Sequence, residues 1–250
     1  MAALVASAAW GQAPTYSAAD IVNASDYSPG PFAPNSVVSL FGTNLSFDAQ
    51  PVTVSQDTMN SAFLPTTLGD VHVLVDGSPA PLLYVDKGQI NFLLPSTEIS
   101  GTSTVQVVRQ SIAGPAVPIT LVNAAPALFA SNGYALAQDY NNNYAAVTPN
   151  TPAHAGDAII LYATGLGYTQ PSSLPGEVPA TAANVVAAVQ VLLNGTAIDS
   201  KLIFYAGVTP GCAGLYQINF IMPGGFGGDT EIRVSAAGQT SAAGLKLAVQ

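Results

Sequence analysis

The same order of predicted strands and turns occurs twice in this chain of 250 residues. Each copy contains the heptad Gln-Ile-Asn-Phe-x-x-Pro, first at Gln89–Pro95 and again at Gln217–Pro223. Upstream of the heptads, SVVSLFGTNL corresponds to DAIILYATGL, and VHVLVDG corresponds to VQVLLNG, in the same order in both halves. Such a repeat constrains the fold strongly, because each copy must form the same supersecondary unit. The sequence therefore predicts an internal duplication.

The elements of each copy are short β-rich runs separated by turn residues. The chain has 23 Gly and 19 Pro, and the runs between them are rich in Val, Ile, Tyr, Phe and Thr. Roughly seven strands per copy at this spacing are typical of sandwiches. We predict an all-β fold of two tandem immunoglobulin-like β-sandwich domains, at residues 17–124 and 125–250. The short linker Asn123–Pro126 predicts a semi-rigid tandem.

Strand alternation predicts which side chains enter the two cores. The amides of each heptad, Gln89 and Asn91 or Gln217 and Asn219, should point away from the core, toward solvent or a neighbouring loop or chain. The predicted core residues are Leu40, Val73, Leu83, Ile90 and Phe92 in the first copy and Leu161, Val191, Ile203, Ile218 and Phe220 in the second.

Charge and the N-terminus indicate where the protein works. Five Lys plus Arg against fourteen Asp plus Glu give a net charge of -9, which disfavours nucleic-acid binding. We interpret residues 1–16 as a signal-peptide remnant or a disordered terminus, because an apolar Ala-rich run precedes Gly11-Gln12-Ala13. No stretch is long and apolar enough to predict a transmembrane span. We expect a secreted or cell-surface protein.

Residues suited to catalysis or metal binding are scarce. With two histidines, His72 and His154, and one cysteine, the sequence predicts neither a hydrolase triad nor a zinc site. Asp139 and the run Asn141–Asn143 are explained better as a hairpin over residues 137–146 than as a calcium loop. A carboxylate pair brought together by the fold stays open as a glycosidase site, although the chain has only three Glu. We expect no catalytic residue, no metal, no cofactor and no enzymatic activity.

Several motifs together resemble a family of uncharacterised secreted bacterial proteins, the Solibacter paralogous C-terminal domain family of acidobacteria. They are IVNASDYSPGPFAPNSVVSLFGTNL, LPTTLGDVHVLVDG, APLLYVDKGQINFLLP, APALFA, ILYATGLG and GLYQINFIMP, and they cover nearly everything from Ile21 to Gln250. The resemblance implies an extracellular location and an immunoglobulin-like sandwich, with no assigned catalytic residues. In that family such segments lie at the end of larger proteins, whereas here the module fills nearly the whole chain.

Our first functional hypothesis is an extracellular structural or adhesive protein that associates with itself or with protein partners at sheet edges. Its strands have few lysines at their edges to prevent pairing with another chain, so strand addition could build a fibre or a surface lattice. The segment Ser17–Ala24 is the candidate donor strand, with Asp20, Ile21 and Val22 as its interaction residues.

The alternative hypothesis is a carbohydrate-binding module, since β-sandwiches bind sugars on exposed aromatic side chains. Tyr134, Tyr140 and Tyr144 lie close together in the sequence, in an insertion that distinguishes the second copy from the first. They are the candidate glycan contacts.

Overall fold

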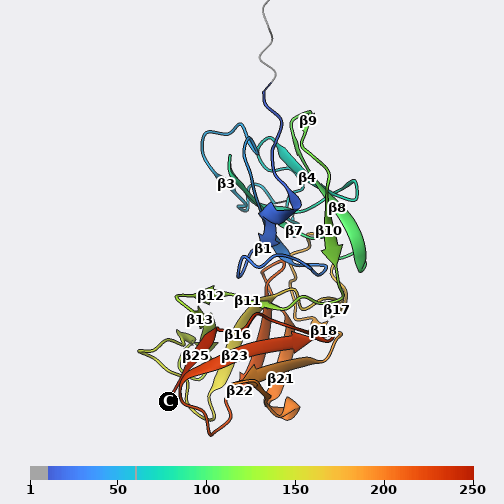
Figure 1. The fold of residues 1–250 in the computed structure, drawn as a ribbon. Helices are drawn as coiled ribbons and strands as arrows, with labels where there is room; N and C mark the ends of the chain where they lie inside the picture. Colours follow the sequence, from blue (N-terminus) through green and yellow to red (C-terminus); the bar gives the residue numbers. More distant parts are fainter. Residues whose placement is uncertain (1–10, 60) are drawn as a thin grey trace, which may run out of the picture.

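The computed structural model describes residues 11–59 and 61–250, and it consists of two β-sandwiches stacked along one axis (Figure 1). Two short 3-10 turns, η1 (Ala18–Asp20) and η2 (Ser200–Leu202), are the helical elements of the described part. The predicted all-β fold of two tandem immunoglobulin-like sandwiches is confirmed. The helices of the described residues are too short to span a membrane.

The first sandwich consists of two antiparallel sheets. Its strands are β1 (Ile21–Asn23), β2 (Val37–Phe41), β3 (Val52–Thr53), β4 (Val71–Val75), β5 (Ser78–Pro79), β6 (Leu82–Val85), β7 (Gln89–Leu93), β8 (Gly101–Arg109), β9 (Ile112–Ala113) and β10 (Val117–Leu121). One sheet has the order β1-β2-β7-β6-β3, and the other has the order β10-β8-β4-β5 with β9 paired to β8.

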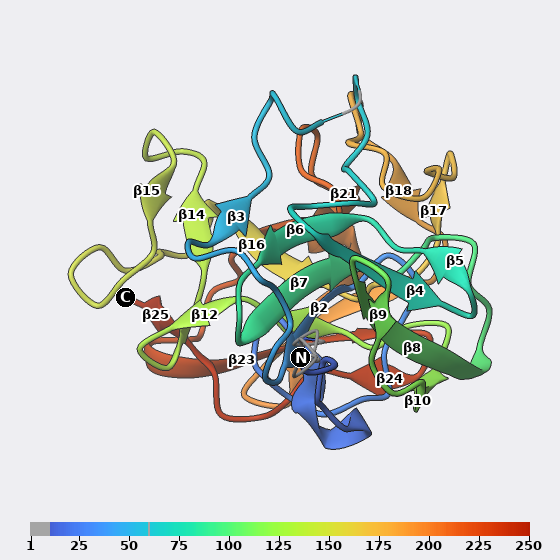
Figure 2. The same cartoon turned by 90° about the horizontal axis from the view of Figure 1, so that it is seen from above.

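The second sandwich lies below the first in Figure 1 and behind it in the view down the long axis (Figure 2). Its strands are β11 (Ala127–Leu128), β12 (Ala130–Ser131), β13 (Tyr134–Ala135), β14 (Ala137–Asp139), β15 (Ala145–Ala146), β16 (Ala158–Thr164), β17 (Thr169–Gln170), β18 (Asn184–Val185), β19 (Val189–Leu193), β20 (Thr196–Ala197), β21 (Ile203–Val208), β22 (Tyr216–Ile221), β23 (Gly228–Ala236), β24 (Gln239–Thr240) and β25 (Lys246–Val249). One sheet runs β15-β14-β16-β22-β21-β18-β17, and the other runs β12-β13-β25-β23-β19-β20.

The two sandwiches repeat the same central strand pairing. In the first, β2 pairs with β7 and places Leu40 opposite Ile90; in the second, β16 pairs with β22 and places Leu161 opposite Ile218. The heptads form β7 and β22, so each lies at the centre of a sheet. Eight of the ten predicted core residues are fully buried: Leu40, Val73, Ile90, Phe92, Leu161, Val191, Ile218 and Phe220.

A β-bulge is repeated as well, and it corrects one predicted core residue. The register between β6 and β7 shifts between Leu82 and Tyr84, and the register between β21 and β22 shifts between Ile203 and Tyr205. A bulge adds one residue to a strand and breaks its alternation. Leu83 is that residue, so it is only half-buried, and its neighbour Leu82 is in the core instead. Ile203 packs against the second core while partly buried.

The chain joins the first core before the predicted start of that domain. Tyr16 is buried in the first core, where its hydroxyl donates to the carbonyl of Pro115 at 2.6 Å and accepts from the Val107 amide at 2.7 Å. Thr15 pairs with Thr43 beside it. The terminal segment was predicted as residues 1–16; residues 1–10 of it lie outside the described part.

Hydrogen bonds tie the two sandwiches together at their junction. The side-chain amide of Asn35 donates to the hydroxyl of Tyr216 at 3.1 Å, and the Val37 amide donates to the Thr164 hydroxyl at 3.1 Å. Tyr216 is fully buried and also donates to the carbonyl of Gly167 at 2.6 Å. Burial raises the pKa of this phenol far above its usual value. These bonds support the predicted semi-rigid arrangement.

The hairpin turns of the facing sheets use the same hydrogen bonds in both copies. Asp76 Oδ1 accepts from the backbone amide of Thr104 at 2.7 Å, and Asn194 Oδ1 accepts from the amide of Glu231 at 2.9 Å. Both turn residues adopt positive φ, of 47° and 48°. A side-chain oxygen thus connects each turn to the neighbouring strand. It belongs to a carboxylate in the first copy and to an amide in the second.

This difference predicts that acid weakens the first turn only. The backbone bond from Thr104 lowers the pKa of Asp76, so its contribution to stability is present above the ordinary carboxyl pKa and is lost as pH falls through the lowered value. We expect Asp76→Asn to keep the turn, as Asn194 does, and to remove this part of the pH dependence. Urea unfolding at neutral pH and at about pH 3 measures it; an unchanged difference between the two conditions would contradict the assignment.

Candidate functional site

The predicted donor strand is already paired within its own domain. On one side β1 pairs with β2, with Ile21 opposite Leu40. On the other side, Val22 bridges to Pro29. Ile21 is buried in the first core. The segment Ser17–Ala24 thus pairs within its own domain in the single chain, and its donation to another chain stays a prediction.

Asp20, which was also predicted as an interaction residue of the donor strand, caps the 3-10 turn η1 before β1. Its Oδ2 accepts from the amide and the hydroxyl of Ser17 at 2.8 and 2.7 Å. These bonds lower the pKa of Asp20. Its carboxylate thus has a local structural role.

The outer strands of the sheets are short. Most of them, including β3, β5, β15, β17 and β20, have two residues each. Short edge strands leave few free backbone groups for another chain to pair with, and natural proteins use them to prevent edge-to-edge association. The geometry gives strand addition little to work with at these edges.

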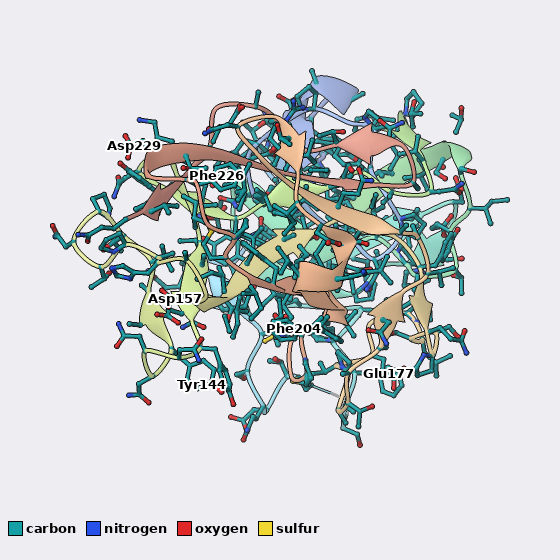
Figure 3. All side chains as sticks on the ribbon, turned by 90° about the horizontal axis from the view of Figure 1, so that it is seen from below. Tyr144, Asp157, Glu177, Phe204, Phe226 and Asp229 are labelled. Carbon is teal, nitrogen blue, oxygen red and sulfur yellow. The ribbon has the colours of Figure 1, made fainter. Side chains whose placement is uncertain are left out.

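The three tyrosines of the alternative hypothesis separate into two places. Tyr134 donates its hydroxyl to Asp229 at 2.7 Å, and Lys246 binds the same carboxylate at 2.8 Å and lies 5.9 Å from the Tyr134 ring. The bonds from Lys246 and Tyr134 lower the pKa of Asp229. Figure 3 shows Asp229 well away from Tyr144. Tyr134 therefore belongs to another cluster, beside a hollow of about 330 Å³ lined by Leu136 and Val147 among others.

Tyr140 and Tyr144 do form a pair, at the tip of the predicted hairpin β14–β15. Their ring centroids are 5.3 Å apart with an interplanar angle of 81°, and the residues are 56% and 52% exposed. Asp139 accepts from the Asn141 amide at 2.9 Å, and Asn141 Oδ1 accepts from the Ala158 amide at 2.7 Å. These bonds fix the tip against β16, so the two rings are held in place while exposed to solvent.

The sheet surface beside this pair carries further polar and aromatic groups. Tyr162 on β16 donates to Gln138 Oε1 on β14 at 2.6 Å and lies opposite Gln217 on β22. Burial, with smaller contributions from Cys212 and Tyr144, raises the pKa of Tyr162. Tyr140 follows Gln138 by two residues, just beyond the end of β14, and its ring pairs with that of Tyr144. We define the tyrosine face as Gln138, Tyr140, Tyr144, Tyr162 and Gln217.

Alternation in the heptads confirms that their amides point away from the core. Gln217 and Asn219 are half-buried, whereas Ile218 and Phe220 between and beyond them are fully buried. Tyr162 and Gln138 were not among the predicted contacts. Alternation in the run 158–164 places Tyr162 on the face opposite Leu161 and Ala163, which could have indicated its exposure. Its partner Gln138 follows only from the pairing of β14 with β16.

The first domain has an equivalent surface that is closed by its own hydrogen bonds. Asn91 Oδ1 accepts from the hydroxyl of Ser39 at 2.9 Å and from the amide of Gln89 at 2.8 Å. In the second domain Ile160, opposite Asn219, takes the place of Ser39 and has no hydroxyl to donate. Asn219 Oδ1 accordingly has no hydrogen-bond partner among the described residues. The second domain thus has the less self-satisfied surface.

Comparisons with known proteins give no family assignment. No family model and no curated protein matches the chain. Among solved structures it is similar to a surface glycan-binding protein from Prevotella bryantii, with 14% identity, a TM-score of 0.29, and coverage of 95% of this chain and 42% of that one. It is also similar to a surface glycan-binding protein of Bacteroides ovatus in complex with a mixed-linkage heptasaccharide (11%, TM-score 0.36, 87% and 42%). A third is the tandem immunoglobulin repeats of Dlar (10%, TM-score 0.22, 87% and 91%). The chain spans less than half the length of the two glycan-binding proteins.

Proposed function

We propose that this chain is a non-catalytic, extracellular glycan-binding protein and that the tyrosine face of the second domain is its binding surface. The observation that carries the proposal is the rigidly held, exposed pair Tyr140 and Tyr144 beside the amides of β14 and β22. The Ala-rich N-terminal run and the resemblance to secreted acidobacterial proteins support the location.

The chemistry of the face suits a neutral saccharide. An aromatic ring offers an apolar surface to the C–H groups of a sugar ring, and a phenol adds a polar end. Side-chain amides can both donate to and accept from hydroxyls, as at Gln138 and Gln217. The face as defined contains no charged side chain. A surface of aromatic rings and amides recognises hydroxyls on a sugar ring and offers no group to compensate a charge.

The environments of the two histidines support a non-catalytic role. His72 Nδ1 lies 3.0 Å from the hydroxyl of Thr67 and 3.2 Å from the carbonyl of Thr66. His154 lies 3.4 Å from Asp157, within one exposed turn. The His72 ring, on β4, thus contacts the loop before its strand, and the His154 ring contacts a carboxylate three residues away.

The proposal predicts that Tyr140→Ala and Tyr144→Ala each weaken glycan binding about tenfold, the effect expected for a central aromatic contact. Affinity electrophoresis against a panel of neutral polysaccharides identifies a ligand, and calorimetry with an oligosaccharide of that ligand gives the dissociation constants. Both side chains are exposed, so the melting temperature should change little.

Tyr27→Ala is the matched control, because Tyr27 is 62% exposed on the first domain and pairs with Phe41 at 6.0 Å between ring centroids. It should leave the affinity unchanged. Absence of binding to every polysaccharide of the panel, or equal affinity in wild type and Tyr144→Ala, would overturn the proposal.

A further inference from the structure

A pocket lies in the first domain beside the end of β8. The turn from β8 to β9 is at the end of the first sandwich that lies furthest from the second (Figure 1). The pocket has a volume of about 380 Å³, the size of a site for a small ligand. The wall is made by the N-terminal segment, the loop after β2, the turn between β6 and β7, and the end of β8. The lining residues are Gln12, Asn44, Ser46, Phe47, Lys87 and Arg109.

Arg109 is the unusual member of this wall. It is 2% exposed, and its guanidinium lies 3.5 Å from the centre of the Phe47 ring. Nη1 donates to the carbonyl of Asn44 at 2.6 Å, and Nη2 donates to the carbonyl of Gln12. Within the described part, no carboxylate lies within ion-pairing distance of it, and its Nε is buried without a partner. Buried arginines are ordinarily paired with an anion, because desolvating a charge is costly.

The two hydrogen bonds to carbonyls connect Arg109 to the backbone at Gln12 and Asn44. They do not neutralise its positive charge, and they leave other N–H groups of the guanidinium, including Nε–H, without a partner. A guanidinium has five N–H donors arranged to bind carboxylate or phosphate geometry in a bidentate manner. Carbonyl dipoles and the Phe47 ring stabilise the charge only partly. The free donors therefore need a different partner.

The distribution of cations points to the same pocket. Lys87 and Arg109 are the only lysine and arginine among the first 200 residues of a chain with a net charge of -9, and both line this wall. The acidic neighbour Asp70 is already engaged, because its two oxygens accept from the Ser46 hydroxyl at 2.7 Å and the Phe47 amide at 3.0 Å. Positive charge is thus concentrated at one place in an acidic domain.

We propose that this pocket binds the oxyanion of a small acidic ligand, a carboxylate or a sulfate group on a molecule of about monosaccharide size. Arg109 and Lys87 provide the charge, and the side-chain amides of Gln12 and Asn44 offer hydrogen bonds to the rest of the ligand. The site is separate from the tyrosine face and does not depend on the function proposed for it.

Thermal unfolding and calorimetry at constant ionic strength test the site, with inorganic sulfate, galacturonate and neutral galactose as probes. Sulfate or galacturonate should raise the melting temperature of the wild type saturably, and galactose should not. The response to sulfate compared with galacturonate identifies which oxyanion the pocket prefers. A ligand that binds only the folded state must stabilise it in this way.

Variants separate this site from general charge effects. Lys87→Gln should weaken binding about threefold, as for an exposed charge, and Arg109→Lys about tenfold, because the fork is lost while the charge stays. Lys201→Gln in the second domain changes the net charge equally and should have no effect. If Arg109→Lys fails to fold, the comparison of ligand binding by Lys87→Gln and Lys201→Gln still tests the site. No saturable response in the wild type, or equal responses in Lys87→Gln and Lys201→Gln, would overturn the proposal.

Discussion

Replacing Phe220 by Ala lowers the free energy of unfolding of the second domain by about 3–5 kcal/mol, the usual cost of removing a buried aromatic ring from a core. Phe220 is fully buried and lies on the central strand β22, opposite Ile159. The hole left by the ring is bounded by strands on both sides, so the surrounding structure cannot easily collapse into it. Urea unfolding measures the loss, and amide hydrogen exchange locates it in β16 and β22.

The duplicated heptad provides two matched variants for this experiment. Phe92→Ala removes the equivalent ring from the first core and should speed exchange in β2 and β7 instead. Gln217→Ala lies on the same strand as Phe220 but points outward, so it should change the free energy by less than about 0.5 kcal/mol. Equal losses of unfolding free energy from Gln217→Ala and Phe220→Ala would show that alternation does not separate core from surface residues in the heptad.

The success of the sequence in predicting the fold has a local cause. In a strand, residues that are two apart share a face, so alternation within Gln217–Phe220 already separates core from surface. The heptads, the hairpin turns at Asp76 and Asn194 and the hairpin β14–β15 all depend on neighbours in sequence. The bulge at Leu83 breaks this rule, because an added residue is accommodated by the partner strand and has no signature in the alternation.

The candidate sites could not be predicted in the same way, because they depend on residues far apart in the sequence. Tyr162 meets Gln138 only because β14 pairs with β16. Arg109 reads from the sequence as the last residue of a strand, and only the fold shows that it is buried against Phe47. Conversely, Tyr134 and Tyr140 are close in sequence but lie in different clusters, since β13 joins one sheet and β14 the other.

Tyr216→Phe should destabilise the protein by about 1–3 kcal/mol and loosen the junction between the domains, because buried groups that lose their partner retain the cost of desolvation. The hydroxyl that is removed donates to Gly167 and accepts from Asn35, the one within the second domain and the other across the junction. Urea unfolding measures the loss of stability. Hydrogen exchange at residues 35–37 and 164–167 reports on the junction.

A double-mutant cycle with Asn35→Ala isolates the bond across the junction, since residues in one network show non-additive effects. Tyr205→Phe is the matched control: Tyr205 is half-buried and donates to the Val208 carbonyl at 2.6 Å inside its own domain. It should leave exchange at residues 35–37 unchanged. If the Tyr216 and Asn35 effects simply add, the bond does not couple the domains. Coupling, in contrast, means that this hydrogen bond helps to hold the two domains in a fixed relative orientation.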